Sequence, residues 1–247
     1  MINRYFFSRS RYLVSALGLL AAIAPNCSNA QEAPIRFTAE APRVAFDGTF
    51  DQTTFGTSFD VNALLPLGGH LGESGFRFRL TAATSSYRYI TNPSPRTLGF
   101  GRSHEGDFLA GYQVVVPKLS VLLAAGPVIV SSEDDLGVHR GFSGAKAAVT
   151  AYATPTDDTM LFARSTYLTI GKAYDFQIKG GARLFGVGYF GPDFKYSGRE
   201  GEHGYRFGPH LSGIAIGPLA VSLAAGWLSS SQLGTGHYFT ASFYAAF

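Results

Sequence analysis

Apolar and polar side chains alternate with a period of two along most of the chain, the pattern of β-strands whose two faces meet different surroundings. Residues 174–184 show it clearly, because their apolar side chains alternate with charged or amide ones: Tyr174, Phe176 and Ile178 against Asp175, Gln177 and Lys179. A helix would spread these charges around its circumference. The same alternation recurs in residues 44–51, 55–62, 76–81, 107–114, 190–197, 205–215, 219–227 and 238–247.

Three other segments are compatible with strands but have a weaker pattern. Residues 119–130 are apolar on both faces, and residues 140–153 have Lys146 alone among mostly small side chains. In residues 159–170, Arg164 lies beside apolar residues, so the register of this strand stays open. Together the segments predict about twelve strands, an even number that brings both ends of the chain to the same side of a barrel.

Residues 211–236 contain no charged side chain, and a hydropathy scan would suggest a transmembrane helix there. Glycines interrupt the segment, a run of serines follows it, and Gly217-Pro218 is a turn signal between two strand-like stretches. A β-hairpin therefore explains this segment better than a helix.

The expected connections fall into two sets that alternate along the chain. One set is short: residues 117–118, 155–158, 186–188 and 217–218. The other is mostly longer and more polar: residues 91–104, 131–139, 197–203 and 229–237. Outer-membrane barrels have this asymmetry, with short periplasmic turns and longer external loops. The connection between residues 61 and 76 breaks this rule, because it is long although its place in the alternation assigns it to the set of short turns.

The polar faces of the strands favour a membrane barrel over a water-soluble sandwich. A soluble sandwich would carry Lys and Glu on its outer faces, whereas these faces carry Gly, Ala, Ser, Thr and isolated charges of both signs. Only 15% of the residues are charged, against roughly 25% in soluble domains. Because a lipid-exposed sheet must satisfy all its backbone groups, it has to close. We therefore expect an all-β fold, a closed antiparallel up-and-down transmembrane β-barrel of about twelve strands.

In such a barrel the charged side chains of the strands would face the lumen. The expected polar lining is Asp47, Asp60, Arg77, Arg79, Asp107, Lys146, Asp175, Lys179, Arg183, Arg206 and His210. These charges have two interpretations: a salt-bridged filling that holds the barrel in shape, or the lining of a path for a polar solute or a glucan. Many of them are opposite in sign, which favours a largely filled lumen.

The two ends of the chain carry signals of secretion and assembly. Residues 1–30 have the features of a signal peptide, with arginines at the start, an uncharged apolar stretch and small residues before Gln31. The apolar stretch is shorter than a spanning helix needs, and Cys27, the only cysteine, would be lost with the signal. Residues 31–42 would form a short periplasmic segment and residues 43–247 the barrel. Phe243 and Phe247 resemble a terminal signal for the barrel assembly machinery.

Charge and motifs indicate little chemistry. Without the arginines of the signal peptide the net charge of +3 falls near zero, which gives no electrostatic case for a nucleic-acid partner. No metal, phosphate-loop or hydrolase motif is present, so we expect no catalytic residue, metal or cofactor. One alternative is a lipid A acyl hydrolase in which His210 would activate Ser212. That pair should face lipid, whereas the alternation places it inside the barrel.

Residues 46–247 resemble the alphaproteobacterial cellulose biosynthesis protein BcsS family. The resemblance depends on the order and spacing of short motifs: Gly75-Phe76-Arg77-Phe78-Arg79, Ser86-Tyr87-Arg88-Tyr89, Gly106-Asp107, Gly111-Tyr112-Gln113, residues 141–146, Phe190-Gly191-Pro192-Asp193, Gly208-Pro209-His210-Leu211, Gly217-Pro218-Leu219 and the final Phe247. It implies an outer-membrane protein associated with bacterial cellulose production. It carries over no catalytic residue.

The resulting expectation is a non-enzymatic barrel in the outer membrane of a Gram-negative bacterium, assisting cellulose biosynthesis or export. Its expected partners are outer-membrane lipid, the barrel assembly machinery, and a cellulose synthase or export complex or the glucan itself. Besides the acyl hydrolase, a surface adhesion barrel remains an alternative. Its partner would bind the connections, chiefly residues 91–104.

Overall fold

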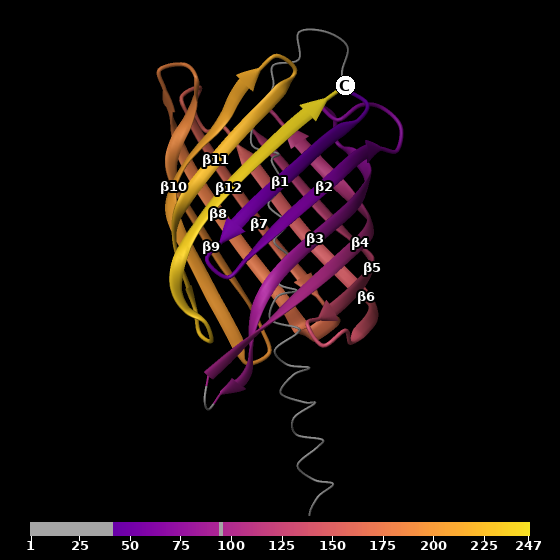
Figure 1. Cartoon of the computed structure of the whole chain (residues 1–247). Coiled ribbons are helices and arrows are strands. Elements are labelled where there is room, and N and C mark those ends of the chain that lie inside the picture. The colour runs from indigo at the N-terminus through magenta and orange to yellow at the C-terminus, as the bar shows by residue number, and fades with distance from the viewer. Residues whose placement is uncertain (1–41, 94–95) are drawn as a thin grey trace, which may run out of the picture.

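The computed structural model describes residues 42–93 and 96–247, so the predicted signal peptide and nearly all of the 31–42 segment lie outside the described residues. In this part of the chain, twelve antiparallel strands form one closed barrel (Figure 1). The predicted fold class and strand number are confirmed. The strands are β1 Ala45–Thr53, β2 Gly56–Pro66, β3 Gly75–Pro93, β4 Arg96–Val116, β5 Leu119–Asp134, β6 His139–Ala153, β7 Thr159–Leu168, β8 Ala173–Leu184, β9 Gly188–Arg199, β10 Glu202–Ile216, β11 Leu219–Ser230 and β12 Gly234–Ala246, with a 3-10 turn η1 Ile170–Lys172.

Each strand pairs with its neighbours in sequence, and the barrel closes where β1 pairs with β12. That pairing runs from Ala45 opposite Ala246 to Thr53 opposite Tyr238. Beyond it, the Phe247 amide donates to the Val44 carbonyl at 2.8 Å. The residues on either side of Gly217 form β10 and β11, so the uncharged segment is a hairpin as expected. Among the described residues, no helix is long and apolar enough to span a bilayer.

The alternation along each strand separates the inside of the barrel from the outside. In β8 the side chains of Asp175, Gln177 and Lys179 are buried, whereas Phe176 and Ile178 are exposed. In β7, whose register the sequence left open, Met160, Phe162 and Arg164 all face the interior and are buried. The inner face of β7 therefore mixes apolar and charged residues, which is why hydropathy alone did not assign it.

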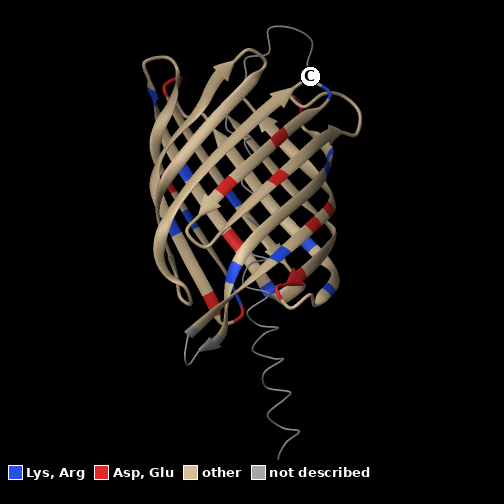
Figure 2. Ribbon diagram, in the orientation of Figure 1, with Lys and Arg blue, Asp and Glu red and all other residues tan. Residues whose placement is uncertain are grey.

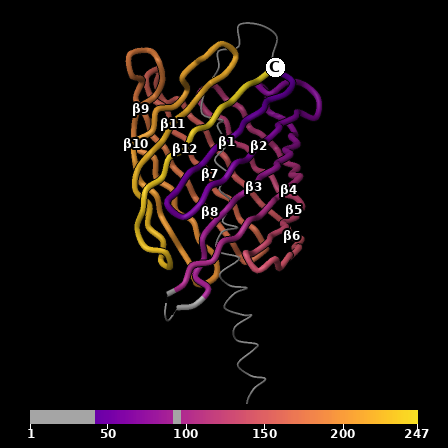
Figure 3. Tube along the Cα trace, in the orientation of Figure 1, coloured from indigo at the N-terminus to yellow at the C-terminus, as the bar shows by residue number. Residues whose placement is uncertain are grey.

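The two ends of the barrel differ. We call the end that holds the start of β1 and the C-terminus the terminal end, and the opposite end the hairpin end. At the hairpin end β3 and β4, with 19 and 21 residues, reach far beyond β1 and β2, with 9 and 11. The β1–β2 hairpin therefore forms a low step in the rim between β12 and β3 (Figures 1 and 3).

The predicted long connections at the hairpin end are wrong. Residues 91–104, expected as a loop, are mostly paired strand, with Pro93 opposite Arg96 and Ile90 opposite Leu98. The other three shrink to residues 135–138, 200–201 and 231–233. The reason is that backbone pairing continues where both faces of a strand are polar, so the end of the hydropathy pattern does not mark the end of the strand.

An apolar cluster fills the barrel at its terminal end. We call it the terminal plug; its residues are Ala45, Leu64, Leu71, Leu109, Leu122, Ala124, Ala148, Ala220 and Tyr244. Leu71 belongs to the β2–β3 connection, which is longer than the alternation of short and long connections predicted. This connection is held in place because the Arg77 guanidinium donates to the His70 carbonyl at 3.1 Å and the Leu71 amide donates to the Pro42 carbonyl at 2.9 Å.

Candidate functional site

Between the terminal plug and the hairpin end, charged side chains line the inside of the barrel. Lys, Arg, Asp and Glu residues occur on strands all around the wall (Figure 2). We call the buried set the charged belt; its residues are Asp47, Asp51, Asp60, Arg79, Asp107, Lys146, Arg164, Asp175, Lys179, Asp193 and Lys195. Burying a charge is costly unless it is paired and hydrogen-bonded, so the belt must supply its own partners.

Lys146 on β6 is the centre of one group in the belt. Its Nζ lies 2.6 Å from Asp107 Oδ2 and 2.7 Å from Glu105 Oε1, both on β4. The Lys146 and Asp107 side chains are fully shielded from solvent. Because β5 lies between β4 and β6 in the sheet, these ion pairs connect strands that share no backbone hydrogen bonds.

A second ion pair spans a wider part of the interior. Arg206 on β10 donates to Asp51 Oδ2 on β1 at 2.6 Å, and Thr240 of β12 donates to the other oxygen of the same carboxylate at 2.5 Å. In the closed sheet β11 and β12 lie between β10 and β1. This contact therefore joins the strands near the closing seam from inside the barrel.

The neighbouring strands β8 and β9 carry two looser ion pairs. Lys195 Nζ lies 3.7 Å from Asp175 Oδ2, and Lys179 Nζ lies 4.0 Å from Asp193 Oδ2. Gln177 also donates to Asp193 at 2.9 Å. Opposite charges therefore alternate along the inner faces of both strands, and this sector needs no external counterion.

Two carboxylates of the belt share an amide. Asn62 Nδ2 donates to Asp47 Oδ1 at 2.8 Å and to Asp60 Oδ2 at 2.9 Å, and the Thr81 hydroxyl donates to the amide oxygen of Asn62 at 2.8 Å. The four residues lie on β1, β2 and β3. Asn62 was not among the expected lumen residues, although it lies two positions after Asp60 and therefore on the same face of the strand.

Most of the expected lumen residues are buried inside the barrel: Asp47, Asp60, Arg77, Arg79, Asp107, Lys146, Asp175, Lys179 and His210. The Arg206 side chain is 13% exposed. Arg183 lies apart from the belt, because it is exposed near the β8–β9 connection, where it donates to the Tyr189 hydroxyl at 3.3 Å.

Sequence reasoning missed several charged residues of the interior. Arg199 and Glu202 lay in a segment expected to be a loop, Glu105 lay between the expected connection of residues 91–104 and the next expected strand, and Arg164 lay in the segment of open register. Arg199 forms an ion pair with Glu202 at 2.6 Å across the β9–β10 turn. The alternation of Asp193, Lys195 and Ser197 leads to Arg199, so continuing the period of two past the expected strand end would have found it.

His210 and Ser212 form a hydrogen-bonded pair, with 2.7 Å between His210 Nδ1 and Ser212 Oγ. Both side chains are buried inside the barrel, away from its lipid-facing side. The other ring nitrogen, Nε2, lies 3.2 Å from the Gly180 carbonyl. That backbone group occupies the position an acidic side chain takes when it orients a catalytic histidine. The pair on β10 is therefore linked to β8 through the Gly180 carbonyl.

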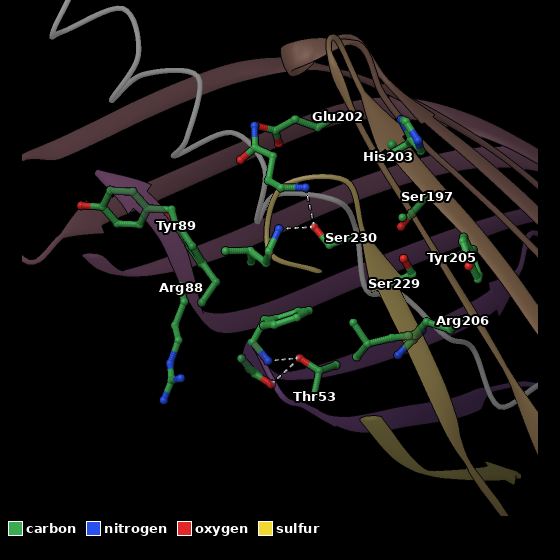
Figure 4. A pocket seen from close by; sticks show the side chains of 18 of the residues that line it. Thr53, Arg88, Tyr89, Ser197, Glu202, His203, Tyr205, Arg206, Ser229 and Ser230 are labelled. Carbon is green, nitrogen blue, oxygen red and sulfur yellow. Dashed lines mark hydrogen bonds between the residues drawn. The ribbon is translucent and has the colours of Figure 1, made fainter. Parts of the chain in front are cut away.

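At the hairpin end the interior opens into a cavity of about 180 Å³ (Figure 4). Its walls come from β1 to β3 on one side and from β9 to β11 with the β11–β12 connection on the other. We call it the rim cavity. Within the described ranges, no cluster of three or more His, Cys, Asp or Glu side chains is arranged to hold a metal ion.

Comparison with known proteins places this geometry in context. The family described as "Cellulose biosynthesis protein BcsS" matches residues 45–247. Among solved structures, the β domain of the Bordetella autotransporter BrkA aligns with a TM-score of 0.51 and 11% identity, covering 84% of this chain and 100% of that chain. This is a likeness of fold.

Two further solved structures align with lower scores. The translocator domain of the autotransporter NalP from Neisseria meningitidis has a TM-score of 0.47 and 13% identity, covering 84% of this chain and 89% of that one. The KdgM porin has a TM-score of 0.47 and 11% identity, covering 82% and 99%. No curated protein sequence matches the chain significantly.

The ion pairs of the belt predict a large difference between two lysine substitutions. Lys146→Met leaves Asp107 buried without its cation, so we expect the free energy of unfolding to fall by about 3–5 kcal/mol. Lys172→Met removes an exposed ion pair with Glu200 at 3.3 Å and should cost less than about 1 kcal/mol. Urea unfolding in lipid vesicles measures both through the fluorescence of Trp227, the single tryptophan, which is exposed on the outer face.

Adding Asp107→Asn to Lys146→Met should restore part of the lost stability, because the more deeply buried of the two partners of Lys146 then carries no charge. Equal losses for Lys146→Met and Lys172→Met would contradict the role assigned to the belt.

Proposed function

Because the chain belongs to the cellulose biosynthesis protein BcsS family, we propose that it is a non-catalytic outer-membrane barrel that assists cellulose biosynthesis or export. One observation carries this proposal: the barrel has an apolar outside and an ion-paired inside. A protein that folds in water places its charges the other way around.

The outer surface supports a location in lipid. Large apolar side chains are exposed on strands around the whole barrel: Phe46, Phe50, Phe59, Leu80, Phe108, Leu123, Ile129, Phe176, Ile178, Phe190, Phe207, Leu223, Trp227 and Phe239. Such a continuous apolar surface far exceeds the largest patches of soluble monomers. Because the sheet is closed, it presents no open edge to lipid. The outer membrane of a Gram-negative bacterium is the membrane in which such barrels occur.

The C-terminus supports delivery by the barrel assembly machinery. Phe247 is exposed at the end of β12, and Phe243 lies on the outer side of the same strand against Gly48 of β1. We thus propose that the assembly machinery recognises β12, the strand that also closes the barrel by pairing with β1. The other proposed partners are outer-membrane lipid and a cellulose synthase or export complex, or the glucan itself.

The filled interior supports an assisting role over an open conduit. The terminal plug closes one end with apolar side chains, and the charged belt occupies the middle with opposite charges in contact. Twelve strands lie between barrels filled by side chains and the larger porins with water-filled channels. We therefore propose that the barrel scaffolds or anchors the process at the membrane.

Deletion of the gene is expected to remove cellulose from the cell surface while synthase activity in isolated membranes stays unchanged, because the barrel acts after or beside polymerisation. Staining of cells with a cellulose-binding dye and synthase assays on membranes measure the two quantities. Normal surface cellulose in the deletion strain would refute the proposed function.

Complementation of that strain tests the non-catalytic part. Genes carrying His210→Ala or Ser212→Ala should restore surface cellulose, since neither side chain reaches the lipid face or acts on a substrate. Lipid A acylation should be the same in all strains. Loss of function in both variants, with normal barrel levels in the membrane, would favour the acyl hydrolase.

The closed interior predicts the electrical behaviour of the purified barrel. In planar bilayers the wild type should show no steady conductance, with or without cello-oligosaccharides. The double variant Leu109→Ala with Tyr244→Ala removes the tyrosine and one of the four leucines of the terminal plug, so it serves as the positive control for insertion. Steady conductance of the wild type would instead support a transport path.

A further inference from the structure

The rim cavity lies behind the low step in the barrel wall. Strands β1 and β2 end where Thr53 pairs with Tyr238 and Gly56 pairs with Tyr87, whereas β12 and β3 continue past them. The lining of the cavity includes both ends of this hairpin and the facing ends of β9, β10 and β11. The cavity therefore sits at the lowest place of the rim at the hairpin end, where a ligand from outside the barrel has the shortest path.

One wall of the rim cavity is aromatic. Tyr87 and Tyr89 of β3 face the interior, with ring centroids 6.2 Å apart. Each ring lies against a glycine of β4: a Cβ atom at Gly101 would come within 2.6 Å of Tyr87 Cζ, and one at Gly99 within 2.7 Å of Tyr89 Cζ. Because both positions lack a side chain, the rings pack against the backbone of the wall and leave space in the lumen.

The two tyrosine hydroxyls differ in their partners. Tyr89 Oη donates to Asp135 Oδ1 at 2.9 Å. Tyr87 Oη is buried and has no hydrogen-bond partner among the described residues. A buried polar group without a partner costs about 1–3 kcal/mol. The hydroxyl oxygen has almost no accessible surface and lies beside Gly101, so a ligand hydroxyl would reach it, and remove this cost, once the Tyr87 side chain shifts toward the lumen.

The opposite wall is rich in neutral hydrogen-bonding groups. Ser197 of β9 and Ser230 of β11 line it together with Gln232 of the β11–β12 connection (Figure 4). Ser230 Oγ accepts a hydrogen bond from the backbone amide of Gln232 at 3.3 Å, which fixes the turn beside the cavity. Ser197 is partly exposed, so its hydroxyl is accessible.

Most of the charged side chains that line the rim cavity are paired with opposite charges, and the exposed Arg88 lies over the Phe100 ring, 5.8 Å from its centroid. Arg199 Nη2 lies 2.6 Å from Glu202 Oε2, and Arg206 is paired with Asp51. Glu202 also accepts a hydrogen bond from the side-chain amide of Gln232. An ionic ligand would have to break these pairs, whereas a neutral one would not.

We propose that the rim cavity binds the end of a neutral glucan chain. Aromatic rings accept the apolar face of a sugar ring, and the hydroxyl, amide and paired charged groups accept or donate hydrogen bonds to its hydroxyls, which is the mixture typical of small-molecule sites. The volume is about 180 Å³, many times the roughly 15 Å³ that one water needs, so it admits sugar units. The choice of a β-1,4-glucan as the probe rests on the proposed function.

Titration calorimetry of the purified barrel with cellohexaose tests the proposal. The detergent must lack a sugar headgroup, since a glucoside would compete for the cavity. We expect saturable binding of cellohexaose and at least about tenfold weaker binding of an oligogalacturonate of equal length, because its carboxylates meet a neutralised site. Equal affinity for both, or no binding of either, would overturn the proposal.

Two pairs of variants localise the binding. Ser197→Trp fills the cavity and should weaken cellohexaose binding by at least about tenfold, whereas Tyr196→Trp, its neighbour on the outer face, should leave it unchanged. Tyr87→Phe should weaken binding about two- to tenfold, whereas Tyr89→Phe removes the bond to Asp135 and should leave the affinity unchanged. If Ser197→Trp fails to fold, the tyrosine pair still decides. Unchanged affinity in Ser197→Trp or in Tyr87→Phe would refute the site.

The deletion experiment distinguishes this inference from the proposed function. A barrel that binds no cellohexaose, in a strain whose surface cellulose depends on it, would refute the binding site alone. A barrel that binds cellohexaose, in a strain whose surface cellulose survives the deletion, would refute the proposed function alone.

Discussion

Hydrogen bonds between β1 and β12 close the sheet, and the arrangement of every side chain inside the barrel depends on that closure. An open sheet in lipid would leave two rows of backbone groups without partners, each costing several kcal/mol. A closed one creates a small interior that water reaches poorly. Closure of the sheet therefore pairs the hydrogen-bonding groups of the backbone and also removes the charged side chains from bulk solvent.

The burial of these charged side chains is offset by ion pairs between strands that are not neighbours in the sheet. Lys146 contacts two carboxylates on β4, and Arg206 contacts Asp51 on β1. Such contacts depend on the curvature of the barrel, because the strands concerned share no backbone hydrogen bonds. The ion pairs and the closed sheet therefore stabilise each other.

The sequence predicted the closed barrel and its inner face wherever the outer face is apolar, as in β8 with Asp175 and Lys179. It could not predict strand length at the hairpin end, because β3 and β4 continue through polar residues such as Ser85 and Arg102 without an apolar partner face. Arg199 and Glu202 were missed for this reason. The rim cavity was also beyond the sequence, because it results from the difference in length between β1–β2 and its neighbours.

The contact between Arg206 and Asp51 joins residues 155 positions apart in the chain, and this has a consequence for the order of assembly. Neither side chain can lose its hydration favourably until the last strands have reached the first ones, so a partly wound sheet gains nothing from them. Long-range contacts of this kind slow folding and make it cooperative. The barrel is thus built to be stable only when whole, and a chain cut short before β10 would keep its inner charges in water.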